Sequence, residues 1–122
     1  ETFIHRAAAL DPWLHEHPPE MVWELYWPAF QIEPTHALVQ TVAQAHQRAA
    51  THSGWTDVEP HYQGFAAGSD ASFLQAAGIP TLIYGPGHLA HAHAVDEHIE
   101  VEDLLVAAKT YALAAAAWCA VA

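Results

Sequence analysis

Apolar residues recur at helical spacing in four parts of the chain, each bounded by residues that start or stop helices. Residues 1–10 form the first part, and the Asp11–Pro12 step should end it because a proline disfavours helical geometry in the residue before it. The other helices are predicted from Thr35 to the Ser53–Gly54 step, from Ser69 to Gly78, and from about Val101 to near the end of the chain.

The two longest predicted helices each carry an apolar face that should meet the core. In the helix from Thr35, four apolar residues follow one another at spacings of four, three and four: Leu38, Val42, Ala45 and Ala49. In the last helix, the predicted contact face consists of Leu104, Ala108, Tyr111, Ala115 and Trp118. Cys119 follows in the same apolar stretch, and we expect a buried, inert thiol there.

Three other segments have the apolar patterns of β-strands, namely residues 21–33, 58–65 and 79–84. The first of them is dense in aromatic and β-branched residues, which favour strands. Pro28 places it at a sheet edge, because a proline cannot donate a ladder hydrogen bond.

Strand and helix alternate over residues 58–119, an order that is typical of a parallel α/β layer with right-handed crossovers. In such layers ligands bind beyond the carboxyl ends of the strands, and the loop after Tyr84 lies at such an end. Residues 1–33 do not continue the pattern, so we place them in a different layer or subdomain. The predicted fold class is therefore α/β, with its chemistry in the loop after Tyr84.

Composition and charge narrow the possible partners. The chain has 122 residues, 11 histidines, only 3 lysines and arginines, and a formal net charge of −11. Without a basic patch it should bind neither nucleic acid nor an anionic membrane surface, and no apolar run reaches the ~18 residues that a membrane span needs. A lone cysteine forms no disulfide framework, and a chain that begins at Glu1 without a targeting segment is expected to be a piece of a longer cytoplasmic protein.

The stretch GPGHLAHAHAVDEH, residues 85–98, gathers four histidines in one predicted loop: His88, His91, His93 and His98. Neutral imidazole is a good ligand for Zn²⁺, so the cluster favours a metal site. The alternative is that these are solvated loop residues, since no zinc-finger spacing with cysteines is present. Spacing alone leaves both interpretations open.

Other residues near the loop also have two interpretations each. Gly85 and Gly87, on either side of a proline, indicate a tight turn that either lets a substrate approach closely or only closes the loop. Asp96 and Glu97 either orient a ligand histidine or precede the next helix. Asp70, farther upstream, either belongs to the site or caps the helix that follows it, and capping is favoured.

Several of these elements recur, in the same order, in one known family. The segment GSDASFLQAAGIPTLIYGPGHLAHAHAVDEHIEVEDL resembles the C-terminal signature of the dizinc family that includes aminoacylases, acetylornithine deacetylases, succinyl-diaminopimelate desuccinylases and carboxypeptidases. The shared pattern is an S/T-D-A segment, then G-I-P, a strand, G-P-G, and A-H-x-x-D-E before a helix. The resemblance covers about residues 66–118.

The upstream segment DPWLHEHPPEMVWELYWPAF resembles the last helix and last strand of the small lid domain of the same family. The resemblance therefore implies that residues 1–33 are the end of a ferredoxin-like lid, or dimerisation, domain. It implies that residues 34–122 are the C-terminal part of a parallel-sheet zinc-hydrolase catalytic domain.

The resemblance also implies roles for single residues. His93 falls on the family's final zinc ligand. The residues implied to shape the substrate site are Gly68, Ser69, Gly85 and Gly87, and those implied to support it are Asp70, Asp96 and Glu97. The family's His-x-Asp and Glu-Glu motifs are absent, so no catalytic residue is expected within this chain, and the general-base glutamate should lie in a missing N-terminal part.

These implications lead to the hypothesis that the chain is a fragment of a metal-dependent amidohydrolase or peptidase. The parent would cleave the amide of an N-acyl amino acid or small peptide with two zinc ions, or cobalt or manganese, whereas the fragment alone would bind metal at most partially and be inactive. Its expected partners are that substrate, the missing N-terminal part, and a second copy that pairs through the aromatic lid edge. The alternative is a stand-alone, non-enzymatic histidine-rich module that binds a metal or a partner.

Overall fold

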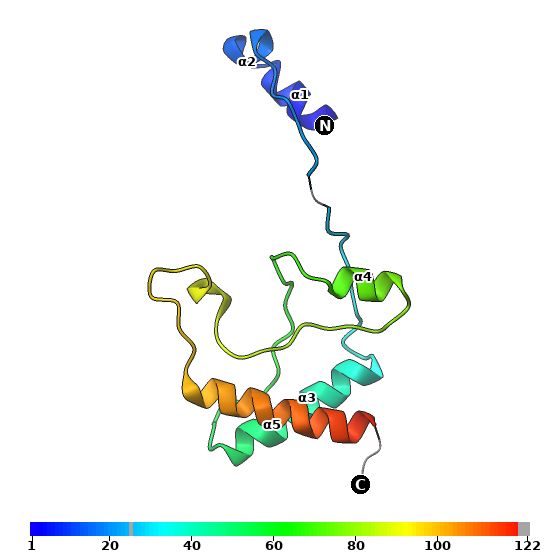
Figure 1. Ribbon diagram of the computed structural model, residues 1–122, viewed down its shortest axis with the longest axis vertical. Coiled ribbons are helices and arrows are strands. Elements are labelled where there is room, and N and C mark those ends of the chain that lie inside the picture. The colour runs from blue at the N-terminus through cyan, green and yellow to red at the C-terminus, as the bar shows by residue number, and fades with distance from the viewer. Residues whose placement is uncertain (25, 120–122) are drawn as a thin grey trace.

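The computed structural model describes residues 1–24 and 26–119. Its elements are α1 (Thr2–Ala8), α2 (Pro12–Glu16), α3 (Ala37–His52), α4 (Ala71–Ala76), the short 3₁₀ helix η1 (Leu89–His91) and α5 (Val101–Trp118) (Figure 1). The four helices predicted from the sequence are present as α1, α3, α4 and α5. Helix η1 lies in a segment for which no helix is predicted. Helix α2 lies where the apolar pattern predicts no helix but the family resemblance implies the last helix of the lid.

Helix α2 arises from the same Asp11–Pro12 step that ends the first helix. Oδ1 of Asp11 accepts hydrogen bonds from the backbone N–H groups of Trp13 and Leu14, both at 2.9 Å. These bonds satisfy donors that the start of a helix leaves open. Pro12 stands in the first turn, where its missing N–H costs nothing. The step therefore stops one helix and starts another, and the prediction from the apolar pattern used only its first effect.

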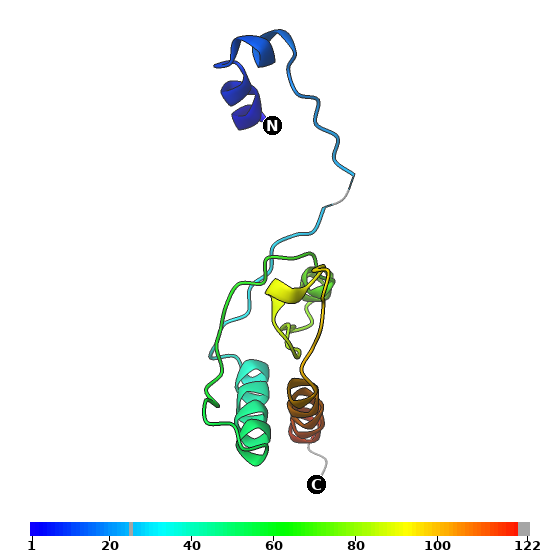
Figure 2. The same cartoon turned by 90° about the vertical axis from the view of Figure 1, so that its left-hand side faces the viewer.

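Helices α3 and α5 lie side by side and run in opposite directions (Figures 1 and 2). The contact is built from small residues: Ala49, Ala50 and Val106 are each 0–1% exposed. Small side chains let the two helix backbones approach closely, as interhelical packing requires. Trp55 and Val58, which follow α3 in the chain, pack against this cluster. The α3–α5 pair is therefore the core of the described structure.

The predicted contact face of α5 was wrong. Leu104, Tyr111 and Trp118 are each about half exposed, whereas Val106 and Thr110 are buried. Helix α5 is apolar on nearly every side, so the spacing of its apolar residues could not select the side that meets the alanines of α3. The prediction for α3 agrees better with the structure, since its members are all buried or half-buried: Leu38, Val42, Ala45 and Ala49.

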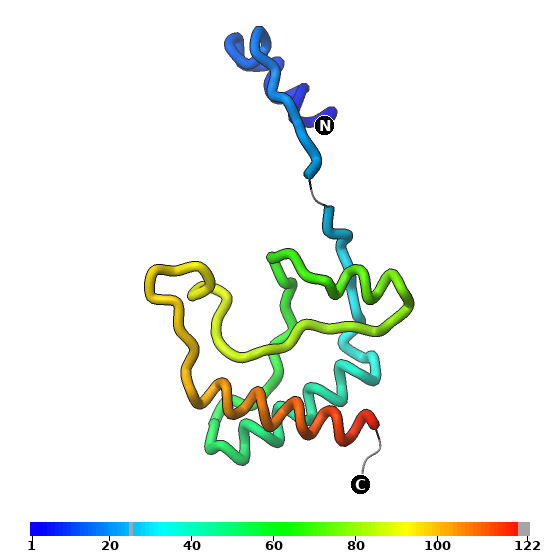
Figure 3. Tube along the Cα trace, viewed as in Figure 1, coloured from blue at the N-terminus to red at the C-terminus, as the bar shows by residue number. Residues whose placement is uncertain are grey.

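Residues 1–24 and 26–119 contain no β-strand, so the predicted α/β class was wrong, both for a parallel-sheet catalytic domain and for a ferredoxin-like lid. The described parts of the segments predicted as strands, 21–33, 58–65 and 79–84, run without a regular backbone ladder (Figure 3). A strand exists through hydrogen bonds to a neighbour, and apolar alternation within one segment does not supply that neighbour. The observed fold consists of helices joined by extended segments and loops.

One extended segment shows what can replace a ladder partner. Nε2 of Gln75, in α4, donates to the carbonyl of Gln31 at 2.7 Å, and its Oε1 accepts from the Gln31 N–H at 3.1 Å. One side-chain amide thus satisfies both backbone groups of Gln31, as a neighbouring strand would. This reciprocal pair fastens the segment before α3 to α4.

Helices α1 and α2 lie at the far end of a long extended segment, away from the α3–α5 pair (Figures 1 and 3). In this arrangement the chain exposes 9603 Å², against about 6,450 Å² for a compact monomer of 13.3 kDa. Part of the excess is apolar, since Phe3, Leu10, Val22 and Trp23 are each more than 70% exposed. Exposed apolar area on this scale is typical of surfaces that contact another polypeptide.

The apolar C-terminal end bears on two predictions. Cys119 is exposed, so the expectation of a buried thiol was wrong. The residue follows the end of α5, beyond the buried stretch around Val106 and Thr110, and nothing covers that position in the described structure. Within the described residues, no helix has both the length and the apolar character that crossing a bilayer requires.

Candidate functional site

An open hollow of about 1340 Å³ lies beside α3, bordered by the extended segments before α3 and α4 and by the segment before η1. It exceeds the ~300–1,000 Å³ of a typical ligand pocket, and it is open to solvent. The four residues implied to shape the substrate site all line it: Gly68, Ser69, Gly85 and Gly87. Glu97 also borders the hollow, whereas Asp70, His93 and Asp96 do not.

Gly68 meets the indole ring of Trp27 at the edge of the hollow. A Cβ at position 68 would lie 3.2 Å from two carbons of that ring, which is closer than ordinary van der Waals contact. The indole packs directly on the backbone of Gly68, and a larger residue would fit only if the ring shifted by a few tenths of an ångström. The wall of the hollow at Gly68 is therefore aromatic.

Ser69 and Asp70 share the start of α4, and the expectation that the Asp70 side chain caps this helix was wrong. Asp70 stands at the N-cap position, but its side chain makes no capping hydrogen bond. Instead, Oγ of Ser69 accepts from the N–H of Ala71 at 3.2 Å, and the Ser69 carbonyl accepts from Oγ of Ser72 at 3.2 Å. The hydroxyl of Ser69 therefore holds the helix start, and the Asp70 carboxylate is not used by the helix.

The turn after Tyr84 needs glycine at one of its two glycine positions. Gly87 has a φ of 83°, and a Cβ there would lie 3.1 Å from Cγ1 of Ile99. Gly85 has no such requirement, since its Cβ would only come within 3.8 Å of the Tyr111 hydroxyl. Gly87 therefore sets the turn, and its backbone brings Ile99 against the root of the loop.

His93 has a positive φ of 62°, and no other non-glycine residue in the described part of the chain does. This left-handed conformation costs a residue with a Cβ ~1–2 kcal/mol. The N–H of His93 donates to Oε2 of Glu97 at 3.3 Å, so the carboxylate of Glu97 supports the strained backbone. Strained positions concentrate at functional sites. The backbone geometry thus singles out the same histidine as the family resemblance does.

The other histidines of the loop interact with one another and with the backbone. The rings of His91 and His98 stack at 4.4 Å between centroids, and His88 lies 5.9 Å from His91. Nδ1 of His98 donates to the carbonyl of Asp96 at 2.6 Å, so Asp96 contributes its backbone and not its carboxylate. Nδ1 of His88 accepts from the N–H of Ala90 at 3.1 Å. These contacts shape the loop around His93.

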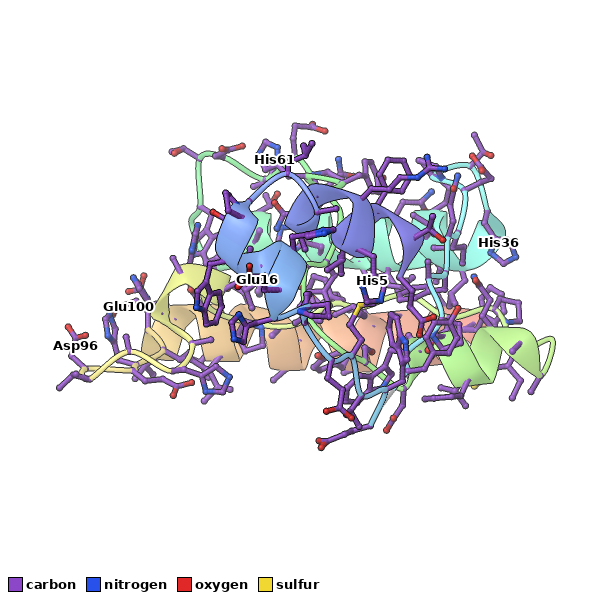
Figure 4. All side chains as sticks on the ribbon, turned by 90° about the horizontal axis from the view of Figure 1, so that it is seen from above. His5, Glu16, His36, His61, Asp96 and Glu100 are labelled. Atoms are coloured by element: carbon purple, nitrogen blue, oxygen red, sulfur yellow. The ribbon has the colours of Figure 1, made fainter. Side chains whose placement is uncertain are left out.

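A metal site is not complete in the described residues. No three His, Cys, Asp or Glu side chains among them lie close enough together to hold a metal ion. Figure 4 shows how dispersed such groups are, with Asp96 and Glu100 at one end of the molecule and His36 at the opposite end. His93 offers a single imidazole, a donor that suits zinc, and further ligands would have to come from elsewhere.

The sequence reasoning missed a hydrogen-bonded network between α3, α5 and the segment that leads into the loop. Nδ1 of His46 lies 2.9 Å from the hydroxyl of Tyr84, which in turn donates to Oγ1 of Thr110 at 3.1 Å. Thr110 donates to the carbonyl of Val106 at 2.8 Å, and the hydroxyl of Tyr111 donates to the Tyr84 carbonyl at 2.7 Å. The rings of His46, Tyr84 and Tyr111 also meet edge to face.

Burial shifts the titration of two members of this network. Desolvation lowers the pKa of His46 from its ordinary value of 6.5. Desolvation also raises the pKa of Tyr84, with the nearby Tyr111 adding to the shift and the hydrogen bond to Thr110 opposing it. A sequence signal for His46 existed, since it stands four residues after Val42 and three before Ala49 on the apolar face of α3. A histidine on a buried face needs a polar partner, but the sequence does not name one.

Comparison with known proteins finds relatives of one family. The family described as Peptidase family M20/M25/M40 matches residues 18–117. Two curated relatives are named N-formyl-4-amino-5-aminomethyl-2-methylpyrimidine deformylase, one from Halalkalibacterium halodurans with 34% identity and one from Bacillus subtilis with 30% identity, each over 98% of this chain. The chain spans only 28% and 29% of the lengths of these relatives. No solved structure matches the chain.

Proposed function

The chain belongs to the peptidase family M20/M25/M40, and from this premise we propose that it is the C-terminal part of an enzyme that cleaves the amide bond of a small N-acylated amine. The family is generally metal-dependent, and the two relatives are named as deformylases, which hydrolyse an amide. Residues 1–33 would belong to a lid or dimerisation unit and residues 34–122 to the catalytic unit.

The observation that carries this proposal is the backbone of His93. His93 is the histidine of the A-H-x-x-D-E pattern. Among the described residues other than glycine, it alone has a positive φ. Rarely populated backbone conformations are more frequent at functional sites than elsewhere, and a metal ligand must be held in one orientation. His93 would bind one zinc ion through a neutral imidazole nitrogen, with Glu97 holding its backbone.

The substrate that we propose first is a formylated aminopyrimidine, with an N-acyl amino acid as the competing class. The hollow is bordered by flat aromatic side chains on which a pyrimidine ring can stack: Tyr26, Trp27, Tyr62 and Phe65. Two carboxylates on its border, Glu59 and Glu97, would accept hydrogen bonds from the amino group on the pyrimidine ring. An N-acyl amino acid carries a carboxylate, which this border would repel.

In the chemistry we propose, two bound zinc ions would supply an acidified water for attack on the acyl carbonyl. The residues of this chain contribute binding and orientation. His93 would supply one imidazole nitrogen to the metal. Trp27 and its aromatic neighbours, which line the hollow, would shield one face of the substrate from water. The general base and the remaining ligands are expected in the part of the enzyme that this chain does not include.

The test uses the full-length enzyme that contains this chain. Formate release from N-formyl-4-amino-5-aminomethyl-2-methylpyrimidine is compared with acetate release from an N-acetyl amino acid. His93→Ala should lower zinc content and reduce turnover more than about 100-fold, because even outer partners of a metal ligand are worth up to that factor. His52→Ala, an exposed histidine at the end of α3, should change neither.

Each result decides a different part of the proposal. Turnover of the N-acetyl amino acid alone would reject the pyrimidine substrate and keep the hydrolase. Full zinc content and full activity in His93→Ala would reject His93 as a ligand. Tight one-to-one zinc binding by the 122-residue chain alone, lost in His93→Ala, would favour the stand-alone metal-binding module instead.

We also propose that the segment 18–33 mediates self-association of the enzyme. Its exposed aromatic and apolar side chains support this, since Val22, Trp23 and Tyr26 are each 71% exposed. Trp23→Lys with Tyr26→Lys should shift the full-length enzyme toward monomer in light scattering. An unchanged dimer would reject this surface, and a monomeric wild type would reject the self-association itself.

A further inference from the structure

Tyr84 is held at two separate points by adjacent residues of α5. Its backbone carbonyl accepts a hydrogen bond of 2.7 Å from the hydroxyl of Tyr111, and its side-chain hydroxyl donates to Oγ1 of Thr110 at 3.1 Å. From the other side, Nδ1 of His46 in α3 reaches the same hydroxyl at 2.9 Å. One residue thus connects both helices of the core.

The donors of this network are fixed by counting protons. The hydroxyl proton of Thr110 goes to the carbonyl of Val106, which can only accept, so Thr110 must accept from Tyr84. The single proton of the Tyr84 hydroxyl is then used, so Nδ1 of His46 must donate to Tyr84. His46 is therefore held as the tautomer that carries its proton on Nδ1, and the hydroxyls of Tyr84 and Thr110 each both donate and accept.

The position of Tyr84 gives this network a consequence for the site. Residues 85–100 form the histidine loop, which follows Tyr84 directly and continues directly into α5 at Val101. One end of the loop is therefore joined to α5 covalently, and the other end is joined to α5 through Tyr84. Figure 3 shows this loop leaving the core and returning to the start of α5. Between the two ends lies His93 with its positive φ.

We propose that Tyr84 is a positioning residue for His93: with His46, Thr110 and Tyr111 it fixes the root of the histidine loop to the α3–α5 pair. The network fixes the position at which the loop begins. This keeps the backbone of His93 at its positive φ and preserves the hydrogen bond from its N–H to Glu97. We call this attachment of the loop through Tyr84 the clamp. The clamp follows from the hydrogen bonds alone, whereas its effect on zinc affinity rests on the proposed function of His93.

The first test measures amide hydrogen exchange in the 122-residue chain by NMR. Tyr84→Phe removes only the hydroxyl and keeps the edge-to-face rings. It should speed exchange at His91, Ala92 and His93, whose N–H groups are bonded within the loop, by about fivefold, the factor expected for one net hydrogen bond. The amides in the middle of α3 and α5 should keep their rates. Unchanged loop exchange, or equal acceleration in loop and helices, would overturn the clamp.

A matched pair of threonine variants separates the clamp from helix packing. Thr41 in α3 donates to the carbonyl four residues before it at 2.9 Å, as Thr110 does in α5, but no tyrosine donates to Thr41. Thr110→Val should accelerate loop exchange as Tyr84→Phe does, and Thr41→Val should not. If both variants accelerate it equally, the effect belongs to the helices and the proposal fails.

The tautomer of His46 gives a readout that packing alone does not change. In the wild type, the two-bond ¹H–¹⁵N pattern of neutral His46 should show the proton on Nδ1, and Tyr84→Phe should remove that preference. A wild-type proton on Nε2 would overturn the network.

In the full-length enzyme, Tyr84→Phe should weaken zinc binding about tenfold, within the range for outer partners of a ligand. Faster loop exchange in Tyr84→Phe with unchanged zinc affinity would reject the positioning role. Full zinc content in His93→Ala would instead reject the proposed function.

Discussion

The α3–α5 pair and the histidine loop, residues 85–100, both contain apolar side chains, but only the pair buries them. Ala50 and Val106 are 0% and 1% exposed, whereas Leu89 and Ile99 are 48% and 52% exposed. A helix makes its backbone hydrogen bonds within itself, so two helices need only meet to bury a face. A loop can bury apolar groups only against a surface that another element supplies. The pair is therefore the platform, and the order of the loop depends on it.

The largest expected effect comes from an aspartate inside the platform. Val106 is 1% exposed in the α3–α5 contact, and an uncompensated buried charge costs about 3–5 kcal/mol. Because small domains are stable by only about 5–15 kcal/mol, Val106→Asp should separate the pair and release the loop with it. Far-UV circular dichroism should show loss of helix, and the loop amides should exchange at the rates of an unfolded chain.

The control variant changes the same residue type at the start of the same helix. Val101 is 69% exposed, and an aspartate there lies in the first turn of α5, where it complements the helix dipole. Val101→Asp should leave helix content and loop exchange as in the wild type. In Val106→Asp, helix content and loop protection should be lost together. If one of them is lost and the other is kept, then the loop does not depend on the pair.

The next effect is confined to the loop and concerns the backbone of His93. Valine is β-branched and is poorly tolerated at positive φ, whereas asparagine adopts that conformation readily. His93→Val should destabilise the loop by about 1–2 kcal/mol in amide exchange, and His93→Asn should leave it as stable as the wild type. Both variants lose the imidazole, so both should lose zinc binding in the full-length enzyme. Equal loop stability in the two variants would show that position 93 carries no backbone strain.

The helices could be predicted from the sequence because the residues that start and stop them act locally. Gly54 and Gly78 end α3 and α4 with φ of 82° and 79°, a conformation that glycine adopts at little cost. The strand predicted over residues 79–84 has suitable side chains, but pairing depends on a neighbour that a single segment does not encode. The same limit explains the α5 face, since the small residues of α3 decide which side of an apolar helix is covered.

The site could be predicted only where one residue type or one motif carried it. Histidine clustering and the family resemblance led to His93, but nothing in the spacing shows that it alone among the loop histidines has a strained backbone. The hydrogen bond between His46 and Tyr84 joins residues 38 apart in the chain. Periodicity indicates that His46 faces the core, but it cannot identify its partner on another element.

A smaller effect is expected at Gly87, where the turn after Tyr84 contacts Ile99 near the other end of the histidine loop. Gly87→Ala places a Cβ at a φ of 83° and 3.1 Å from Cγ1 of Ile99, which should destabilise the loop by about 1 kcal/mol. Gly64→Ala is the matched control, because its φ is not positive and a Cβ there meets nothing within 4 Å. Gly64→Ala should be neutral or slightly stabilising through the unfolded state. Amide exchange at Ala92 and His93 measures both, and equal rates in the two variants would contradict the role of Gly87.

The smallest expected effect is a pH dependence of the platform that the loop should share. Burial lowers the pKa of His46 below 6.5, with Tyr84 and Trp55 as its aromatic neighbours, so the folded state favours the neutral ring. Above pH 6.5 the residue is neutral in both states and costs nothing. As the pH falls below 6.5, the unfolded chain takes up the proton first, and stability declines until the pH passes the lowered pKa of the folded state. His46→Gln should flatten that decline in urea unfolding between about pH 8 and pH 5. A stability difference between wild type and variant that is constant with pH would show that the charge on His46 is not disfavoured by the fold.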